Sequence, residues 1–233
     1  MRLDRPVGTL LLLCPTLAAL AMAAGDIPSL ELIIIFTVGT FVMRSAGCVI
    51  NDYADRHVDG AVKRTKDRPL VTGAVSERQA LQLFAGLLAS AGLLTLFLNT
   101  TTKLLAVGGL ALAVTYPFMK RYTHLPQVVL GAAFSWGILM AWSAQDLGVP
   151  AQAVLLFVGS LFWIVAYDTQ YAMVDRDDDL IVGIKSTAIL FGELDRFMIA
   201  VLQTLALGTW FLLGVNLNYQ SAFFVGLIII TGL

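Results

Sequence analysis

Two short acidic stretches carry the residues whose types and spacing best fit a chemical role. The first runs from Asn51 to Asp59 and the second from Asp168 to Asp179, and each follows directly on a long apolar run. Ionisable side chains at the end of a membrane-length segment are costly, so they point first to a function. We therefore treat the two stretches as the candidate site.

The spacing within each stretch predicts one acidic face on a helix. At about 100° per residue, Asp52, Asp55 and Asp59 fall within one sector, with Asn51 at its margin. The stripe of the second stretch contains Asp168, Tyr171, Asp175 and Asp179. Like charges on one helix face destabilise the helix, so we expect a cation between them. Carboxylates in two groups suit Mg²⁺, which is commonly shared between one or two carboxylates and substrate phosphates.

The composition identifies the solvent around these stretches as lipid. Of the 233 residues, 58% are apolar and 13% are charged, whereas soluble domains have about 45–50% and about 25%. The chain is therefore expected to be all-α, a polytopic transmembrane helical bundle, because helices satisfy their own backbone in lipid. Apolar stretches take up nearly the whole length, so we expect one transmembrane domain over residues 1–233 and no sizeable soluble domain. Cys14 and Cys48 lie in apolar runs, where buried small side chains are expected.

Eight apolar segments have the length of spanning helices. They cover residues 7–24, 30–50, 80–98, 103–119, 126–144, 151–167, 197–215 and 221–233. The first also resembles a cleaved signal peptide, but its length favours a span. The last is still apolar at Leu233, so we expect the bundle to be truncated at its carboxyl end.

The uneven distribution of basic residues predicts the orientation of the bundle. With the amino terminus in the cytoplasm, thirteen Lys and Arg residues lie on the cytoplasmic side, Lys103 lies on the other, and Arg44 lies within a span. This is the positive-inside pattern. Both acidic stretches then share the cytoplasmic face, where the loops are expected to cap a central cavity.

Basic side chains near the acids indicate an anionic ligand. Lys63, Arg64 and Arg68 follow the first stretch, and Lys185 follows the second. Such side chains pair directly with a diphosphate whose remaining charge Mg²⁺ bridges. Topology alone also explains a basic cytoplasmic loop. We favour Arg68 among these residues, because Pro69 stiffens the backbone beside it.

Arg44 is the charge in the interior of the second apolar segment. Helical turns from Asn51 through Gly47 bring it to the same face of the helix, but deeper. There it is placed to meet the carboxylate of a second substrate. The alternative explanation is a buried ion pair or a snorkelling side chain.

Together these motifs resemble the UbiA superfamily of intramembrane prenyltransferases. The resemblance rests on Asn51-Asp52-x-x-Asp55-x-x-x-Asp59, Arg68-Pro69-Leu70 and Asp168-x-x-Tyr171-x-x-x-Asp175-x-x-x-Asp179. Residues 51–56, 116–121 and 183–187 are similar to the branch that prenylates 4-hydroxybenzoate in ubiquinone biosynthesis. The resemblance covers nearly the whole chain, and members of the superfamily usually have nine spans, against the eight counted in this sequence.

The resemblance implies Mg²⁺-dependent transfer of a polyprenyl group from its diphosphate to 4-hydroxybenzoate, ortho to the hydroxyl, with release of diphosphate. The implied metal ligands are Asn51, Asp55, Asp59, Asp168, Asp175 and Asp179. The implied catalytic residues are Asp55, Asp59, Asp175, Asp179 and Arg44. The implied substrate-binding residues are Asn51, Asp52, Lys63, Arg64, Arg68, Tyr116, Lys120, Arg121, Tyr171, Asp168 and Lys185.

Aromatic rings are the expected lining for the allylic cation left when diphosphate departs. The candidates are Tyr53, Tyr116, Trp136 and Tyr171, although Trp136 fits lipid-facing packing at least as well. A related enzyme with a haem, naphthoate or tocopherol-precursor acceptor would differ only in the acceptor pocket. A transporter would also place acids in a bundle, usually near the midplane and in repeats.

The expected partners are polyprenyl diphosphate, 4-hydroxybenzoate and the lipid bilayer, and no nucleic acid. The expected location is a bacterial inner membrane with the site facing the cytoplasm. The sequence does not indicate an oligomeric state.

Overall fold

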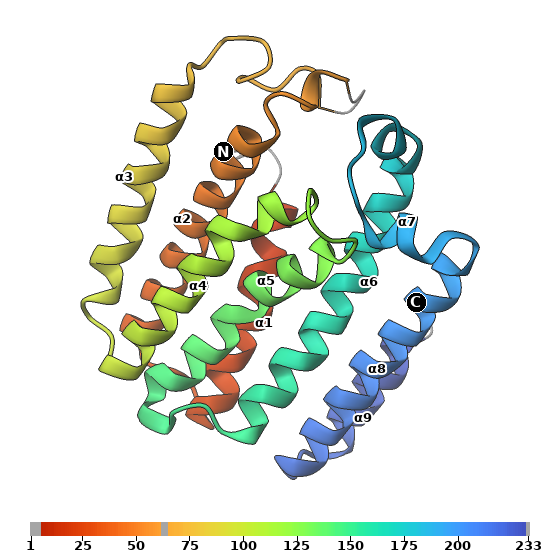
Figure 1. The fold of residues 1–233 in the computed structure, drawn as a ribbon. Helices are drawn as coiled ribbons and strands as arrows, with labels where there is room; N and C mark the ends of the chain where they lie inside the picture. Colours follow the sequence, from red (N-terminus) through yellow and green to blue (C-terminus); the bar gives the residue numbers. More distant parts are fainter. Residues whose placement is uncertain (1–5, 62–64, 232–233) are drawn as a thin grey trace.

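The computed structural model describes residues 6–61 and 65–231, and within these it is a bundle of helices without a strand (Figure 1). The predicted all-α architecture is confirmed. The helices are α1 (Val7–Ala24), α2 (Leu30–Asp55), α3 (Glu77–Thr95), α4 (Thr100–Met119), α5 (Pro126–Trp142), α6 (Ala151–Val182), α7 (Thr187–Phe191), α8 (Asp195–Asn216) and α9 (Ser221–Thr231). Each of the eight predicted apolar segments corresponds to one of these helices in the described part of the chain, and α7 is a short additional helix.

Six helical segments in the described part of the chain are long and apolar enough to cross a membrane. They are Val7–Ala24, Leu30–Asp55, Thr100–Met119, Pro126–Leu147, Ala151–Val182 and Thr187–Asn216. The first two turns of α3 contain Glu77, Arg78, Gln79 and Gln82, and α9 is shorter than a full span. The chain is a multi-pass membrane protein, while the count of eight spans and the orientation stay predictions.

Small residues set the distances between helices. A Cβ on Gly137 of α5 would lie 2.5 Å from the Thr16 hydroxyl of α1, and one on Gly159 of α6 would lie 2.5 Å from the Trp210 indole of α8. Such close approach is typical of helix packing in lipid, where association depends on fitted contact. The buried core at these contacts includes Leu20, Ile138 and Leu213.

Helix α6 is the element that most exceeds its predicted length. Its 32 residues correspond to about 48 Å at 1.5 Å per residue, against roughly 30 Å for the hydrocarbon core of a bilayer. It begins after Pro150 and ends at Val182, where Gly183, with a φ of 73°, caps the last turn. The second acidic stretch is therefore a continuation of a spanning helix.

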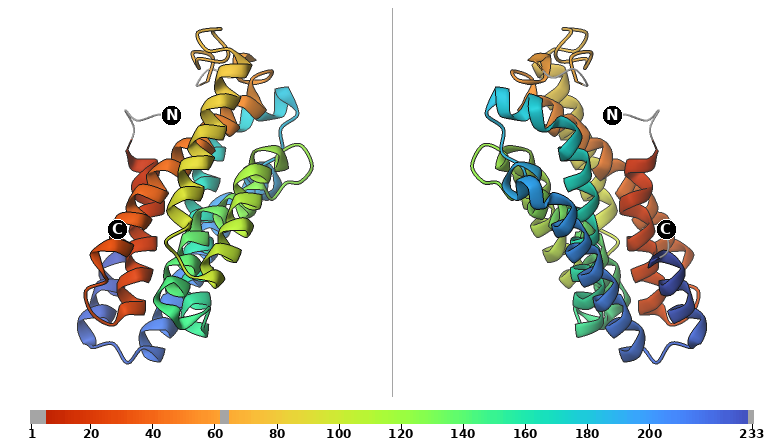
Figure 2. Two further views of the ribbon diagram at one scale, coloured as in Figure 1. Left: turned by 90° about the vertical axis from the view of Figure 1, so that its left-hand side faces the viewer. Right: turned by 90° about the vertical axis from the view of Figure 1, so that its right-hand side faces the viewer.

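The chain segments that matter for the site gather at one end of the bundle. The loop after α2, the turn between α4 and α5, and the segment after α6 lie there (Figure 1), and the side views agree (Figure 2). The connections between α1 and α2, α3 and α4, and α5 and α6 lie at the opposite end. This grouping matches the predicted sharing of one face by the two acidic stretches.

Candidate active site

Asp59 reaches the site from a turn and not from a helix. Helix α2 ends at Asp55, and Asp59 begins the short 3₁₀ helix Asp59–Ala61. The prediction that Asp59 shares a helical stripe with Asp52 and Asp55 is therefore wrong. The Arg56 guanidinium donates to the Tyr53 carbonyl over 2.7 Å and lies over the Tyr53 ring, so it satisfies a carbonyl left unpaired at the helix end.

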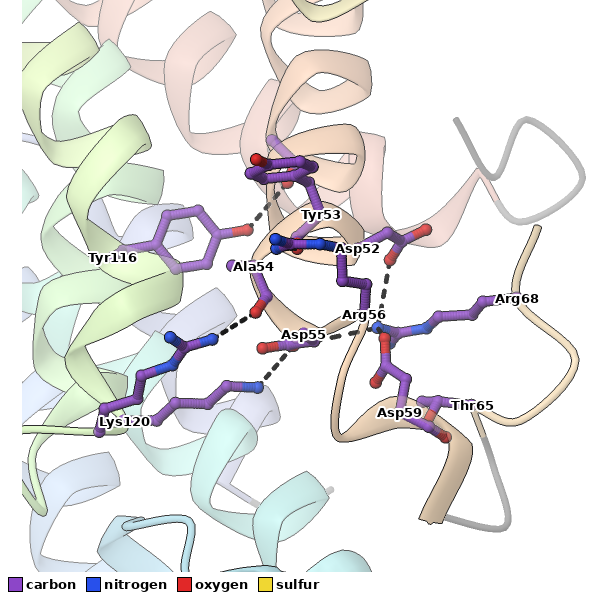
Figure 3. A network of polar contacts seen from close by, with 12 residues as sticks. Asp52, Tyr53, Ala54, Asp55, Arg56, Asp59, Thr65, Arg68, Tyr116 and Lys120 are labelled. Atoms are coloured by element: carbon purple, nitrogen blue, oxygen red, sulfur yellow. Dashed lines mark hydrogen bonds and ion pairs between the residues drawn. The ribbon is translucent and has the colours of Figure 1, made fainter. Parts of the chain in front are cut away.

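Arg68 brings the three acids of the first stretch together all the same (Figure 3). Its Nη1 lies 2.5 Å from Asp59 Oδ2, 3.2 Å from Asp52 Oδ1 and 3.9 Å from Asp55 Oδ2. The Arg68 backbone N–H donates to the Thr65 carbonyl, and the Thr65 hydroxyl donates to the Asp59 carbonyl. The loop thus fixes one guanidinium among three carboxylates.

Lys120 joins the turn between α4 and α5 to the same acids. Its ammonium lies 2.5 Å from Asp55 Oδ2, and its carbonyl accepts a hydrogen bond of 2.9 Å from the Lys185 N–H. The Arg121 guanidinium donates to the Ala54 carbonyl and lies over the Phe118 ring. This turn therefore ties the end of α2 to the segment after α6.

The first acidic group contains one carboxylate oxygen without a hydrogen-bond partner in the described part of the chain. Asp55 Oδ1 is buried and has no hydrogen-bond partner. Burial raises the pKa of Asp59; Arg68 opposes this rise, and the Asp55 charge adds to it. A further cation at this point would favour the charged form of these carboxylates.

The second acidic stretch keeps the predicted helical geometry. Asp168, Tyr171, Asp175 and Asp179 all lie along continuous α6 and line one cleft. The segment after α6 is fixed by Thr187, whose N–H donates to Gln127 Oε1 over 3.0 Å and whose hydroxyl lies 2.7 Å from that of Thr169. The Lys185 ammonium donates to the Tyr122 carbonyl over 3.3 Å.

The cleft has a volume of about 700 Å³ and lies between the two acidic groups. The predicted site residues that line it are Arg44, Asn51, Asp55, Asp59, Arg68, Tyr116, Lys120, Asp168, Tyr171, Asp175, Asp179 and Lys185. Asp52 and Arg121 are not in its lining; Asp52 pairs with Arg68, and Arg121 binds a backbone carbonyl. Lys63 and Arg64 lie outside the described residues.

Some lining residues were not predicted from the sequence. They are Gly8, Thr65, Gln127, Phe134, Tyr167 and Ser186. Tyr167 directly precedes Asp168, so its position beside an acidic stretch was the available signal. The others lie on elements that approach the acids only in the folded chain.

An apolar cavity of about 340 Å³ adjoins the cleft. Arg44, Tyr116 and Phe134 line both spaces, and the Tyr116 hydroxyl donates to the Gly47 carbonyl over 3.2 Å. Trp136 lines only the cavity; its indole packs on Gly109 and donates to the Leu105 carbonyl over 2.7 Å. Among the described residues, these three therefore mark the boundary between the charged cleft and the apolar cavity.

The carboxylate oxygens that line the cleft fit a Mg²⁺ ion bound partly by the protein and partly by a ligand. The described residues contain no cluster of three or more His, Cys, Asp or Glu side chains arranged to hold a metal by themselves. Carboxylates instead stand on two walls, and the Asp55 Oδ1 atom is unpartnered. Mg²⁺ usually binds through one or two carboxylates and completes its shell with waters and phosphates.

The family model described as UbiA prenyltransferase family matches residues 12–233. The chain belongs to the UbiA prenyltransferase family. A Pseudomonas savastanoi pv. phaseolicola protein named 4-hydroxybenzoate octaprenyltransferase is 57% identical over 231 residues, which are 99% of this UbiA-family chain and 78% of that protein. A Vibrio cholerae protein of the same name is 56% identical over 233 residues, which are 100% of this chain and 82% of that protein.

Solved structures share the fold of this UbiA-family chain. An apo UbiA homolog from Aeropyrum pernix K1 superposes with a TM-score of 0.86 at 26% identity, covering 97% of this chain and 85% of that one. A UbiA homolog from Archaeoglobus fulgidus, bound to GPP and Mg²⁺, superposes with a TM-score of 0.79 at 23% identity. The superposition covers 98% of this chain and 82% of that one. The fold of the archaeal proteins is therefore present in the described residues.

Proposed function

We propose that this chain transfers a polyprenyl group from polyprenyl diphosphate to the ring of 4-hydroxybenzoate, ortho to the hydroxyl, as a step of ubiquinone biosynthesis. The relatives that bear the name of this activity are 56–57% identical over nearly the whole chain. The observation that carries the proposal is a cleft with carboxylates on two walls and cations between them, which meets an apolar cavity. A diphosphate ester of a long hydrocarbon has this combination of charge and apolar surface.

Six oxygen-bearing side chains are the proposed ligands of Mg²⁺. They are Asn51 and Asp55 at the end of α2, Asp59 in the 3₁₀ turn that follows, and Asp168, Asp175 and Asp179 on α6. When bound, Mg²⁺ neutralises the charge that develops on the diphosphate as the carbon–oxygen bond breaks. The carboxylates orient the donor so that its diphosphate lies between the walls and its chain points into the bundle.

Basic side chains are the proposed direct contacts of the diphosphate. Arg68, Lys120 and Lys185 line the cleft at the level of the acids, and their N–H groups can donate to phosphate oxygens. Lys63 and Arg64 stay predicted members of this group. Arg121 acts on the diphosphate indirectly, because it holds the turn that carries Lys120.

The apolar cavity is the proposed site of the first part of the prenyl chain. Tyr116 and Phe134 stand at its junction with the cleft, so their rings lie where an allylic cation would form. Aromatic side chains at this junction limit the contact of water with that cation, and their ring faces stabilise it. Arg44, at the same junction, is the proposed contact of the acceptor carboxylate.

We further propose that residues 1–233 form one prenyltransferase domain, with the acidic end of the bundle facing the cytoplasm of a bacterial inner membrane. The basic residues of the loops support this orientation. Labelling of single cysteines placed at Thr72 and at Asp146, in intact cells, tests it. Labelling of position 146 alone by a membrane-impermeant reagent is the expected result.

The activity is tested on the purified chain in lipid with a panel of prenyl diphosphates and aromatic acceptors. We expect prenylated 4-hydroxybenzoate and free diphosphate with Mg²⁺, and neither when EDTA is present. If product forms with a naphthoate, haem or tocopherol-precursor acceptor and not with 4-hydroxybenzoate, that other compound is the acceptor. Solute transport without product with any donor would contradict the proposal and favour a transporter.

A further inference from the structure

Gln127 is a buried amide in the wall of the cleft. It is the second residue of α5, has 6% of its surface exposed and lines the cleft. Its Oε1 accepts a hydrogen bond of 3.0 Å from the backbone N–H of Thr187, at the start of α7. A backbone N–H can only donate, so the oxygen of the carboxamide must face Thr187. The orientation of the amide is therefore fixed, and Nε2 points away from Thr187.

Thr187 is itself held firmly by α6. Its hydroxyl lies 2.7 Å from that of Thr169, and the Thr169 hydroxyl donates to the Val165 carbonyl over 2.6 Å. Because the Thr169 proton is used in that bond, the Thr187 hydroxyl must be the donor to Thr169. Both threonines are fully buried. Gln127 thus rests on a rigid part of the fold, and turning its amide over would break a buried hydrogen bond.

The Nε2 group of Gln127 is a donor without an acceptor. Among the described residues no oxygen accepts a hydrogen bond from it, and the atom is not enclosed by the protein. The space that Gln127 lines is the cleft, so its donor hydrogens are open to a ligand there. They also lie in the first turn of α5, the positively polarised end of a helix. Both features favour an anionic ligand.

Two helices place this donor at the level of the acids. Thr169 directly follows Asp168 on α6, and Gln127 is joined to Thr169 through Thr187. On α5, Gln127 precedes Phe134 by seven residues, which correspond to about 10 Å. Phe134 marks the boundary with the apolar cavity. The amide therefore lies in the charged part of the cleft and not at its junction with the apolar cavity.

We infer that Nε2 of Gln127 donates a hydrogen bond to an oxygen of the prenyl diphosphate. The inference rests on the proposed function and adds a neutral donor to the basic contacts. Arg68 and Lys120 are shared with the carboxylates of the first acidic stretch, which compete with a ligand for their hydrogens. The amide of Gln127 has no such competitor among the described residues. It is therefore fully available to the diphosphate.

Gln127→Glu is the test, because a carboxylate still accepts from the Thr187 N–H but has no hydrogen to donate. The probe is inorganic diphosphate with Mg²⁺, titrated by calorimetry in detergent at about pH 8, where Glu is charged. We expect its Kd to rise more than about tenfold, since the loss of a hydrogen bond to a charged group is joined by repulsion. KM for 4-hydroxybenzoate should stay within about twofold.

Gln127→Met and Thr187→Val separate loss of the donor from added charge and from loosened structure. Gln127→Met removes the donor without adding charge, so the Kd of diphosphate should rise about tenfold. Thr187→Val loses the bond to Thr169 but keeps the amide donor, so it should lower the thermal midpoint and change this Kd less than Gln127→Met does. Gln82→Glu, on the exposed face of α3, is the control for added charge and should bind diphosphate normally.

Three outcomes would overturn the contact between Gln127 and the diphosphate. They are an unchanged Kd in Gln127→Met, an equal rise in Thr187→Val, and an effect confined to KM for the acceptor. If Gln127→Met does not fold, the comparison of Gln127→Glu with Thr187→Val and Gln82→Glu decides in the same way. Absence of Mg²⁺-dependent diphosphate binding in the unmodified chain would instead refute the proposed function itself.

Discussion

The ammonium of Lys120 lies 2.5 Å from Oδ2 of Asp55, a carboxylate with a residue exposure of only 3%. The second oxygen of the same carboxylate is buried without a partner. One atom of Asp55 is thus neutralised by a residue from another helix, and the other is available to a ligand. A buried carboxylate in this state depends on its remaining cations.

Lys120→Met should lower the thermal midpoint of the metal-free chain by several degrees, because among the described residues it leaves the buried Asp55 carboxylate with Arg68 as its remaining ion-pair partner. Differential scanning fluorimetry in detergent measures this. Mg²⁺ with inorganic diphosphate should restore part of the loss by supplying a new cation. Lys66→Met is the matched control, because Lys66 is exposed on the same loop as Arg68. Equal midpoints for the two variants would contradict the importance of the Lys120–Asp55 pair.

Asp55→Asn and Asp175→Asn should each reduce the Mg²⁺-dependent turnover by at least about a hundredfold, since each removes a charged metal ligand from one wall. The measurement is product formation across a Mg²⁺ titration. Asp177→Asn, on the exposed side of α6, controls for loss of negative charge and should retain activity. If Asp55→Asn and Asp175→Asn both retain Mg²⁺-dependent turnover, neither residue is a metal ligand.

Arg68→Ala should raise KM for polyprenyl diphosphate by about tenfold or more, because a guanidinium that contacts three carboxylates and faces the cleft is lost. Arg68→Lys should rescue little, since an ammonium lacks the planar fork that reaches several oxygens. Arg78→Ala, on the exposed start of α3, is the control. A larger effect on KM for the acceptor than on KM for the donor would speak against the diphosphate contact.

Arg44→Ala should weaken use of 4-hydroxybenzoate more than use of the prenyl diphosphate. The physical reason is the loss of a charged partner for the acceptor carboxylate. Steady-state KM values for the two substrates, each at saturating levels of the other, measure the difference. Equal effects on the two values would exclude Arg44 from the acceptor site.

Gly8→Ala should act through Arg44. The new Cβ would lie 2.5 Å from Nη2, so the flexible end of Arg44 must move, and KM for the acceptor should rise a few-fold. In the Arg44→Ala background Gly8→Ala should have no further effect, because residues that act as a unit are not additive. Gly86→Ala, where a Cβ meets nothing within 4 Å, is the control. Additive losses in the double variant would mean that Gly8 and Arg44 act separately.

The acidic stripe on α6 was predictable because one regular helix fixes it. Asp168, Asp175 and Asp179 keep their relation through helical periodicity alone. For Asp59 periodicity was misleading, because α2 ends at Asp55 and a loop side chain, Arg68, gathers the acids. Sequence spacing contains no signal for a contact across a loop.

The sequence by itself determined the membrane environment, the helical class, the two acidic motifs and the resemblance to a family. These follow from composition and from contacts between residues near one another in the chain. Only the tertiary structure decided which cation contacts which acid, that Arg121 donates to a backbone carbonyl, and that Arg44 lines both the cleft and the apolar cavity. Such relations depend on how separate helices pack, and packing is set by the fit of all side chains at once, as where Gly8 leaves room for Arg44.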